Sequence, residues 1–151
     1  MIVRQLLRSE PIPYQLLFLA DPSKEMIDLY FDYTYTYVAD IESQIVGVLV
    51  LYPLDNDAIE IKNIAVVSEY QEKGIGTALL SRIFTLMKNK GFTKLIIGTA
   101  NTSIIPLQFY QKMGFKICSI KKNFFIENYS EPIFEDGNQC VTLSSKLCKF
   151  I

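Results

Sequence analysis

The sequence predicts a single α/β domain over residues 1–151, with a mixed, mostly antiparallel sheet of about seven strands flanked by about four helices. Length and composition are the first reason. A chain of 151 residues fits one domain, and 50% hydrophobic with 21% charged residues is typical of a compact globular protein. The second reason is an N-terminal half in which short polar turns separate strand-like runs. The third is a C-terminal half in which helical and strand-like patterns alternate, with no linker or repeat.

The first half of the chain is predicted to hold two helices and an antiparallel meander. Ser23 is a suitable N-cap for the second helix, because a serine hydroxyl can accept a hydrogen bond from the first helical turn. Polar turns at Glu42-Ser43 and at Asp55–Asp57 separate runs rich in β-branched residues. The expected elements are a strand at Ile2–Leu7, helices at Pro13–Ala20 and Ser23–Asp32, and strands at Tyr33–Asp40, Ile45–Leu54 and Ala58–Val67.

The second half opens with an amphipathic helix that ends at Asn89–Gly91. Its apolar residues recur at intervals of three and four, which is the period of a helix with one buried face. These residues are Leu79, Leu80, Ile83, Phe84 and Met87. The later elements are expected to be a strand at Lys94–Thr99, a helix from about Ser103 to Met113, and strands at Phe115–Tyr129 and Gln139–Leu147, with a loop around Pro132 and Gly137.

Charge and hydropathy exclude several classes of function. The net charge is −1 and there is no basic block, so neither nucleic-acid nor membrane-surface binding is predicted. The longest apolar run, Ile45–Tyr52, is far shorter than the ~20 residues of a membrane span. Arg4 and Arg8 stand too close together to frame the core of a signal peptide. We therefore expect a soluble cytoplasmic protein.

Cysteine and histidine usage narrows the chemistry. The three cysteines, Cys118, Cys140 and Cys148, lack metal-type or redox-type spacing, which predicts free thiols in a reducing compartment. The sequence contains no histidine, which excludes an imidazole base and histidine-ligated zinc. A general base must then be a carboxylate, a lysine, a tyrosine, a chain terminus or a water that relays the proton.

The stretch VVSEYQEKGIGTALL, from Val66 to Leu80, predicts an anion site where a strand meets a helix. The N-terminus of that helix offers unpaired backbone N–H groups and the positive end of the helix dipole. Gly74 and Gly76 let the backbone approach an anion closely, while Lys73 and Thr77 add a charge and a hydroxyl, an arrangement that suits a pyrophosphate. The P-loop and dinucleotide patterns are absent. A tight turn without a ligand is the alternative.

Two motifs carry a family resemblance. Gln71-x-x-Gly74-x-Gly76, after a strand, resembles the acetyl-coenzyme A signature of the GNAT acetyltransferase superfamily. Asn101 followed by LQFYQKMGF is similar to the family's later segment N…Y-E-K-x-G-F. The resemblance covers nearly the whole chain, and most specifically residues 58–115. The segment FFIENYSEPIFEDGNQC also looks like one bacterial branch whose substrates are poorly defined.

The resemblance implies a GNAT-like domain and acetyl-CoA as co-substrate, without a metal. Two parallel strands, Ala58–Val67 and Lys94–Thr99, would splay apart to admit the pantetheine arm, which would pair with the backbone of Ala65 and Val67. The Val67 amide would stabilise the oxyanion, and amides from Lys73 to Thr77 would hold the pyrophosphate. The implied cofactor-binding residues are Ala65, Val66, Val67, Gln71, Glu72, Lys73, Gly74, Ile75, Gly76, Thr77 and either Asn101 or Ser103.

The resemblance also implies two catalytic residues for direct transfer of acetyl to a primary amine of a small molecule or peptide. Glu60 stands where some members carry a catalytic base, acting directly or through water; it could instead be an ordinary strand carboxylate or a partner for Lys62. Tyr110 occupies the position of the family's general acid, although it could be a packed tyrosine beside Phe109. Cys118 has no activating neighbour in the sequence, which favours direct transfer over an acyl-enzyme.

The acceptor side is less specified. We expect an acceptor pocket between the N-terminal helices, the first hairpin and the final loop. Strand alternation places Tyr33, Tyr35 and Tyr37 on one face of a strand in this region. These tyrosines could be ordinary core packing or an aromatic wall that binds a cationic amine. Acidic residues of the final loop could add charge at its mouth or simply be solvated: Glu131, Glu135 and Asp136. Homodimers are common in the family, which leaves a homodimer open. The rival functions are a noncatalytic acyl-CoA-binding or sensory module and a purely structural domain.

Overall fold

The structure, a computed structural model, describes residues 1–100, 104–122, 134–135, 138–139 and 143–151. Its residues form two compact units, Met1–Thr93 together with Ile151, and Lys94–Phe150. No helix within the described ranges is long and apolar enough to cross a membrane. That the whole chain acts as one domain stays a prediction.

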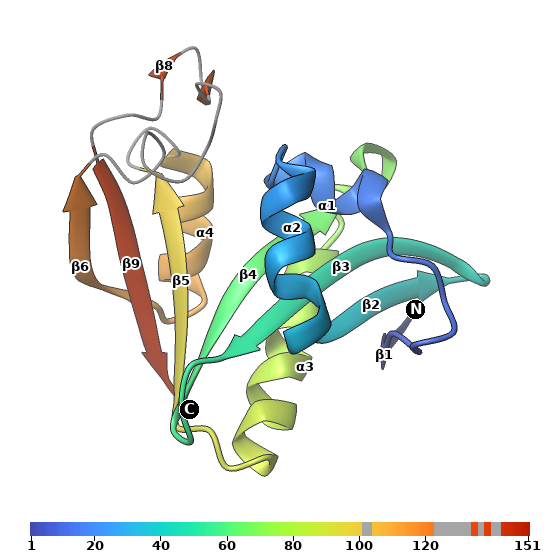
Figure 1. The fold of residues 1–151 in the computed structure, drawn as a ribbon, viewed down its shortest axis with the longest axis horizontal. Coiled ribbons are helices and arrows are strands. Elements are labelled where there is room, and N and C mark those ends of the chain that lie inside the picture. The colour runs from blue at the N-terminus through green and yellow to red at the C-terminus, as the bar shows by residue number, and fades with distance from the viewer. Residues whose placement is uncertain (101–103, 123–133, 136–137, 140–142) are drawn as a thin grey trace. The chain divides into compact units, whose positions relative to one another are not determined.

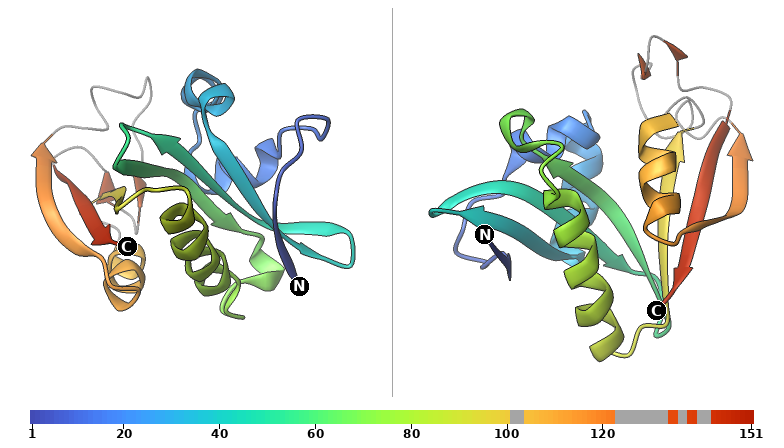
Figure 2. Two further views of the ribbon diagram at one scale, coloured as in Figure 1. Left: turned by 90° about the horizontal axis from the view of Figure 1, so that it is seen from below. Right: turned by 180° about the vertical axis from the view of Figure 1, so that it is seen from behind.

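The first unit is an antiparallel sheet in the order β1-β2-β3-β4, covered on one face by α1 and α2 and on the other by α3 (Figures 1 and 2). Its elements are β1 (Ile2–Gln5), α1 (Tyr14–Ala20), α2 (Lys24–Tyr30), the 3-10 turn η1 (Phe31–Tyr33), β2 (Tyr35–Ile41), β3 (Gln44–Pro53), β4 (Ala58–Val66), the 3-10 turn η2 (Ser68–Tyr70) and α3 (Ile75–Asn89). The predicted meander and its preceding helices are thus confirmed.

The predicted caps and turns explain where these elements begin and end. The Ser23 hydroxyl accepts a hydrogen bond from the Met26 N–H at 3.2 Å, as an N-cap should. Glu42 and Ser43 both adopt positive φ, 50° and 65°, the conformation of a two-residue primed hairpin turn. The Asp55 carboxylate accepts hydrogen bonds from the Asp57 and Ala58 N–H groups, each at 2.7 Å, and so fixes the turn into β4.

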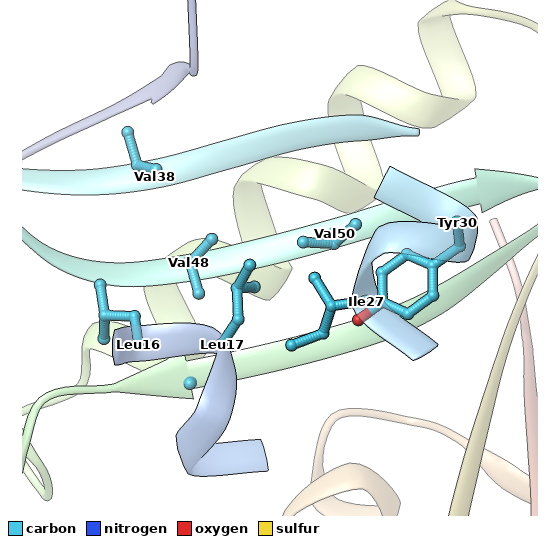
Figure 3. Close-up of a cluster of buried hydrophobic side chains, with 8 residues drawn as sticks. Leu16, Leu17, Ile27, Tyr30, Val38, Val48 and Val50 are labelled. Carbon is cyan, nitrogen blue, oxygen red and sulfur yellow. The ribbon is translucent and has the colours of Figure 1, made fainter. Parts of the chain in front are cut away.

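A hydrophobic cluster lies between the sheet of the first unit and α1 and α2, and most of it is labelled in Figure 3. Its buried members are Leu16, Leu17, Ile27, Tyr30, Val38, Val48, Val50 and Ala65. On the opposite face, α3 buries Ile75, Leu79, Leu80, Ile83 and Met87, as its apolar period predicts. The sheet is therefore packed on both faces, and α3 is held firmly at the end of β4.

A β-bulge interrupts β4. Val50 of β3 pairs with Asn63, but Leu51 pairs with Ile61, so Lys62 is an extra residue without a partner in the ladder. Tyr52, which packs against the α1/α2 cluster, lies opposite Glu60. Glu60 and Asn63 consequently face the same side of the sheet, although three positions separate them.

The second unit is an antiparallel sheet in the order β5-β9-β6, with α4 over one face (Figures 1 and 2). Its elements are β5 (Lys94–Ala100), α4 (Ile104–Lys112), β6 (Lys116–Lys122), the short pair β7 (Phe134–Glu135) and β8 (Asn138–Gln139), and β9 (Leu143–Phe150). The predicted last strand, Gln139–Leu147, is misplaced: Gln139 pairs with Phe134, and β9 runs on until Phe150 pairs with Lys94. The rest of the predicted strand Phe115–Tyr129 lies outside the described residues after Lys122.

The expectation of three free thiols is wrong. Cys118 of β6 and Cys148 of β9 form a disulfide, with Cα atoms 6.0 Å apart and 30 positions between them in sequence. The two strands are neighbours in the sheet, which spacing along the chain could not reveal. Cys140 lies outside the described residues.

Candidate active site

A sharp elbow connects β4 to α3 through η2. Glu72 and Gly74 both have positive φ, 60° and 82°, and Gly74 is the N-cap residue of α3. A Cβ added at Gly74 would meet no other atom within 4 Å, so the space beside this backbone is open. The glycine is therefore required by the left-handed turn, and its missing side chain leaves room for a ligand to approach the main chain.

The first turn of α3 presents unpaired backbone donors. The first intrahelical hydrogen bond runs from the Ala78 N–H to the Gly74 carbonyl at 2.9 Å, so the N–H groups of Ile75, Gly76 and Thr77 precede the helical ladder. Gly74 provides no side-chain cap, and the first turn of α3 contains no acidic residue. This positive helix end fits a diphosphate, which carries negative charge and accepts several hydrogen bonds.

Three side chains shape the elbow around those donors. Ile75 is only 5% exposed and anchors the helix end in the core. The exposed Lys73 ammonium lies 5.5 Å from the centre of the Tyr70 ring, at the surface of the loop. The Gln71 amide donates a hydrogen bond to the Val66 carbonyl at 2.9 Å. The signature glutamine thus ties the loop to the last residue of β4.

The register of β4 corrects the predicted pantetheine contacts. The Val67 N–H donates to the Val46 carbonyl at 2.9 Å, so this amide is not free to bind an oxyanion. Hydrogen-bonded pairs alternate in an antiparallel ladder, so Ala65 opposite Val48 also directs its backbone toward β3. The roles predicted for the backbone of Ala65 and Val67 are therefore wrong. Val66 is the residue that directs its amide toward the other edge of β4.

Glu60 lies on β4 in a well-defined ion pair. One of its carboxylate oxygens is 2.8 Å from the Lys62 ammonium, and the two side chains are 15% and 34% exposed. The same ammonium is 5.6 Å from the centre of the Tyr52 ring. Ile59 and Ile61 are buried, as strand alternation predicts. The partnership with Lys62 is present, and the role of Glu60 as base stays a prediction.

Tyr110 lies on α4 between two phenylalanines. Its ring is 5.3 Å from that of Phe109 and meets that of Phe115 edge-on at 5.8 Å. Tyr110 is 6% exposed, and this burial raises the pKa of its hydroxyl above the ordinary value of 10.0. The hydroxyl therefore stays protonated at neutral pH, as a general acid requires. Its packing also fits the alternative of a helix tyrosine beside Phe109, so the acid role stays a prediction.

The predicted acceptor residues are only partly described. Tyr37 is 4% exposed. The Lys90 ammonium, at the end of α3, lies 4.9 Å from the centre of the Tyr35 ring. Tyr33 is in η1 and 71% exposed, so the three tyrosines do not form one wall and core packing accounts for Tyr37. The remaining candidates lie outside the described residues or have undescribed side chains: Asn101, Ser103, Glu131, Glu135 and Asp136.

Sequence reasoning missed two features of this region. Val66 was among the predicted cofactor-binding residues, but the direction of its amide was not predicted, because it depends on strand register, and the bulge at Lys62 was missed. Asn63 is 3% exposed and donates to the Leu17 carbonyl at 2.9 Å, which ties α1 to β4. Among the described residues, no three His, Cys, Asp or Glu side chains gather closely enough to hold a metal ion.

Comparison with known proteins identifies the family. The model of the "Acetyltransferase (GNAT) domain" matches residues 32–117. An uncharacterized N-acetyltransferase of Bacillus subtilis (strain 168), YvbK, is 42% identical over 127 residues, which cover 84% of this chain and 82% of that protein.

Two solved structures with bound coenzyme are similar over the whole chain. A GNAT family acetyltransferase from Elizabethkingia anophelis with acetyl-CoA bound is 46% identical with a TM-score of 0.95, over 99% of this chain and 97% of the other. A Bacillus subtilis acetyltransferase in complex with CoA is 37% identical with a TM-score of 0.89, over the same shares of 99% and 97%. The chain therefore belongs to the GNAT acetyltransferase family, has the GNAT fold class that its sequence predicts, and is an acetyltransferase that uses acetyl-CoA.

Proposed function

We propose that the protein transfers the acetyl group of acetyl-CoA directly to a primary amine of a small molecule or peptide, in a ternary complex. The observation that carries the proposal is the elbow at Gly74, where an uncapped helix end lies beside open space. Such an end binds diphosphates through backbone N–H groups and the helix dipole.

In this proposal, different residues of the elbow bind different parts of coenzyme A. Backbone N–H groups from Lys73 to Thr77 hold the pyrophosphate, with the Lys73 ammonium adding charge. Gln71 and Glu72 shape the loop, because Gln71 is bonded to Val66 and Glu72 is in a left-handed turn. The Val66 amide, which points away from β3, binds the pantetheine arm or the thioester oxygen. Asn101 or Ser103 supplies a further contact.

The reaction needs a base and an acid. A lysine-like amine has a pKa near 10.4, so presenting it neutral at pH 7 costs about 4.6 kcal/mol. Glu60, directly or through a water, takes the proton from the attacking amine nitrogen. The nitrogen bonds to the thioester carbon, the C–S bond breaks, and Tyr110 donates its hydroxyl proton to the leaving thiolate. The Tyr110 hydroxyl carries its proton at neutral pH, and burial, which raises its pKa, makes it a weaker acid than an exposed tyrosine.

A noncatalytic acyl-CoA-binding module is the second candidate. The Glu60–Lys62 ion pair favours it, because the lysine ammonium occupies the carboxylate that would have to receive the proton of the amine. An amine panel with acetyl-CoA separates the two candidates, with polyamines, aminoglycosides and peptide N-termini as acceptors. Thiol release that requires an amine supports the enzyme, whereas coenzyme A binding without turnover across the panel supports the module.

The direct test of the elbow compares Gly74→Val with Gly91→Val. Both glycines have positive φ, 82° and 98°, and a Cβ at either would meet nothing within 4 Å, so both variants strain the backbone alike. Gly74→Val should weaken coenzyme A binding at least about tenfold by calorimetry, because a side chain would fill the space beside the N–H donors. Gly91→Val should bind like the wild type. Equal affinities in the two variants would contradict the assignment.

Location and assembly complete the proposal. We place the protein in the cytoplasm of a bacterium, because the Bacillus subtilis relative and the Elizabethkingia anophelis structure, 42% and 46% identical to this chain, are bacterial. We propose a homodimer by analogy with the family, and the molar mass from light scattering would test this oligomeric state.

A further inference from the structure

We infer that the disulfide between Cys118 and Cys148 is a reversible redox clamp that raises turnover by holding the strand which follows the Tyr110 helix. The inference rests on the proposed function in one respect, the role of Tyr110 as general acid. Every contact that carries it lies within the second unit, between α4, β6 and β9.

The two cysteines differ in access. Cys118 is exposed where the β6–β9 register shifts between Ile117 and Ser119. Cys148 is 7% exposed, in a strand that pairs on both sides, with β5 and with β6. A small thiol or disulfide in solution can therefore reach the Cys118 sulfur, while Cys148 acts as the partner that closes the bond.

A short chain of contacts leads from the disulfide to Tyr110. Ile117, next to Cys118, pairs with the fully buried Leu147 of β9. Two residues earlier, the Phe115 N–H donates to the Tyr110 carbonyl at 3.0 Å, and the Phe115 ring meets the Tyr110 ring edge-on. The disulfide therefore fixes the start of β6, and the start of β6 fixes both the end of α4 and one wall around Tyr110.

The chemistry is a thiol–disulfide exchange with an oxidised low-molecular-weight disulfide such as oxidised glutathione. The Cys118 thiolate attacks one sulfur of the oxidant, forms a mixed disulfide and expels one thiolate. The Cys148 thiolate then attacks the Cys118 sulfur, closes the protein disulfide and expels the second thiolate. Two protein thiols lose two electrons and two protons in total, and the oxidant becomes two thiols.

The test begins with the whole protein equilibrated in oxidised or reduced glutathione. Peptide mapping by mass spectrometry should find the Cys118–Cys148 link in the first sample and not in the second. The oxidised form should melt about 5–10 °C higher, because the bond closes a loop of about 30 residues in the unfolded chain. Cys118→Ser should abolish both differences, and Cys140→Ser, the matched control, should keep them. Absence of the link in oxidised wild-type protein would overturn the inference.

Coupling to Tyr110 is measured by two readouts. Oxidised protein should show at least about threefold higher kcat than reduced protein, because small displacements of a catalytic group slow a reaction. KM for acetyl-CoA should not change, since the elbow is in the first unit. Hydrogen exchange at the Phe115 amide should be slower in the oxidised form.

The two readouts separate failure of the clamp from failure of the proposed function. Equal kcat values, or equal exchange at Phe115, would overturn the clamp. Exchange that differs between the redox states while no amine is acetylated would support the clamp on Phe115 and contradict the proposed function.

Discussion

At the scale of single residues, the direction of each backbone amide at the end of β4 decides which of them are free to bind a ligand. The motif Gln71-x-x-Gly74-x-Gly76 predicts the elbow from sequence, because glycine spacing and the start of an apolar helix are local signals. The sequence could not show that the Val67 amide is taken by the Val46 carbonyl, because this contact depends on pairing across the hairpin. The ring contacts of Tyr110 and the ion pair of Glu60 likewise arise only on folding.

Replacing Tyr110 with phenylalanine removes the proposed acid and keeps the ring packing. We expect Tyr110→Phe to lower kcat by about ten- to a hundredfold in steady-state assays, with coenzyme A affinity unchanged. Because burial raises the pKa of Tyr110, the wild-type rate should not fall through loss of this proton until well above pH 10.0. Tyr37→Phe, a change at another buried tyrosine, is the control and should retain activity. Wild-type turnover in Tyr110→Phe would remove Tyr110 from the acid role.

Glu60 and Lys62 can be tested as a pair. Glu60→Gln keeps the shape of the side chain but removes its basicity, so the acetylation rate should drop by about tenfold or more. Lys62→Met breaks the same 2.8 Å ion pair while leaving the carboxylate in place, and it should retain or increase the rate. If both variants lose activity equally, the ion pair matters for structure and Glu60 is not the base.

At the scale of elements, the contact between β3 and α3 positions the elbow. The helix period of α3 and the long apolar run of β3 were readable from sequence, because each extends over many residues. The end of β9 was not, because its last residues are defined by their pairing with the start of β5. The β7–β8 pair was missed for the same reason, since only two residues pair on each side.

Gly47 permits α3 to approach β3. A Cβ at this position would lie 3.1 Å from Leu79 Cδ1 and 3.2 Å from Ile75 Cγ2, both closer than ordinary contact. Gly47→Val should therefore destabilise the fold by about 1–3 kcal/mol in urea unfolding and weaken coenzyme A binding by displacing the helix end. Gly98→Val, at a strand glycine whose Cβ would meet nothing within 4 Å, is the comparison. Equal loss of stability in both variants would show that glycine itself, not the contact, is responsible.

At the scale of the whole molecule, contacts between residues on different elements hold together the helices and strands that local sequence patterns predict. Arg4 of β1 donates to both Glu10 oxygens at 2.8 and 2.9 Å and also to Asp40 of β2, joining the N-terminal segment to the sheet. The Arg4–Asp40 contact and the Cys118–Cys148 bond join positions 36 and 30 apart in sequence, so no local motif predicts them. Fold class was predictable from sequence because it needs only the order and type of elements.

The Arg4 link makes stability depend on pH. The Arg4 hydrogen bonds lower the pKa of Glu10 from 4.5 to about 2. Because the folded pKa is depressed, the stabilisation is fully present above pH 4.5 and is lost as pH falls toward 2. Glu10→Gln should therefore show a shallower loss of stability across this window in acid titrations followed by circular dichroism. Glu42→Gln, at the exposed hairpin turn, should follow the wild-type curve. A Glu10→Gln curve as steep as wild type would contradict the assignment.

Because Lys62 is an extra residue, the alternation of side chains between the two faces of β4 shifts by one position at the bulge. Even-numbered positions before it and odd-numbered positions after it look toward α1 and α2, as Glu60 and Asn63 do. If side chains alternated regularly from Asn63 back toward the start of β4, Glu60 would face away from α1 and α2. The extra residue reverses this, so Glu60 faces α1 and α2. Deleting Lys62 would remove the bulge, but Glu60 would stay opposite Tyr52 on the α1/α2 side, with a single residue between it and Asn63. The deletion would therefore take away the ammonium partner of the carboxylate without reversing the face on which the carboxylate lies.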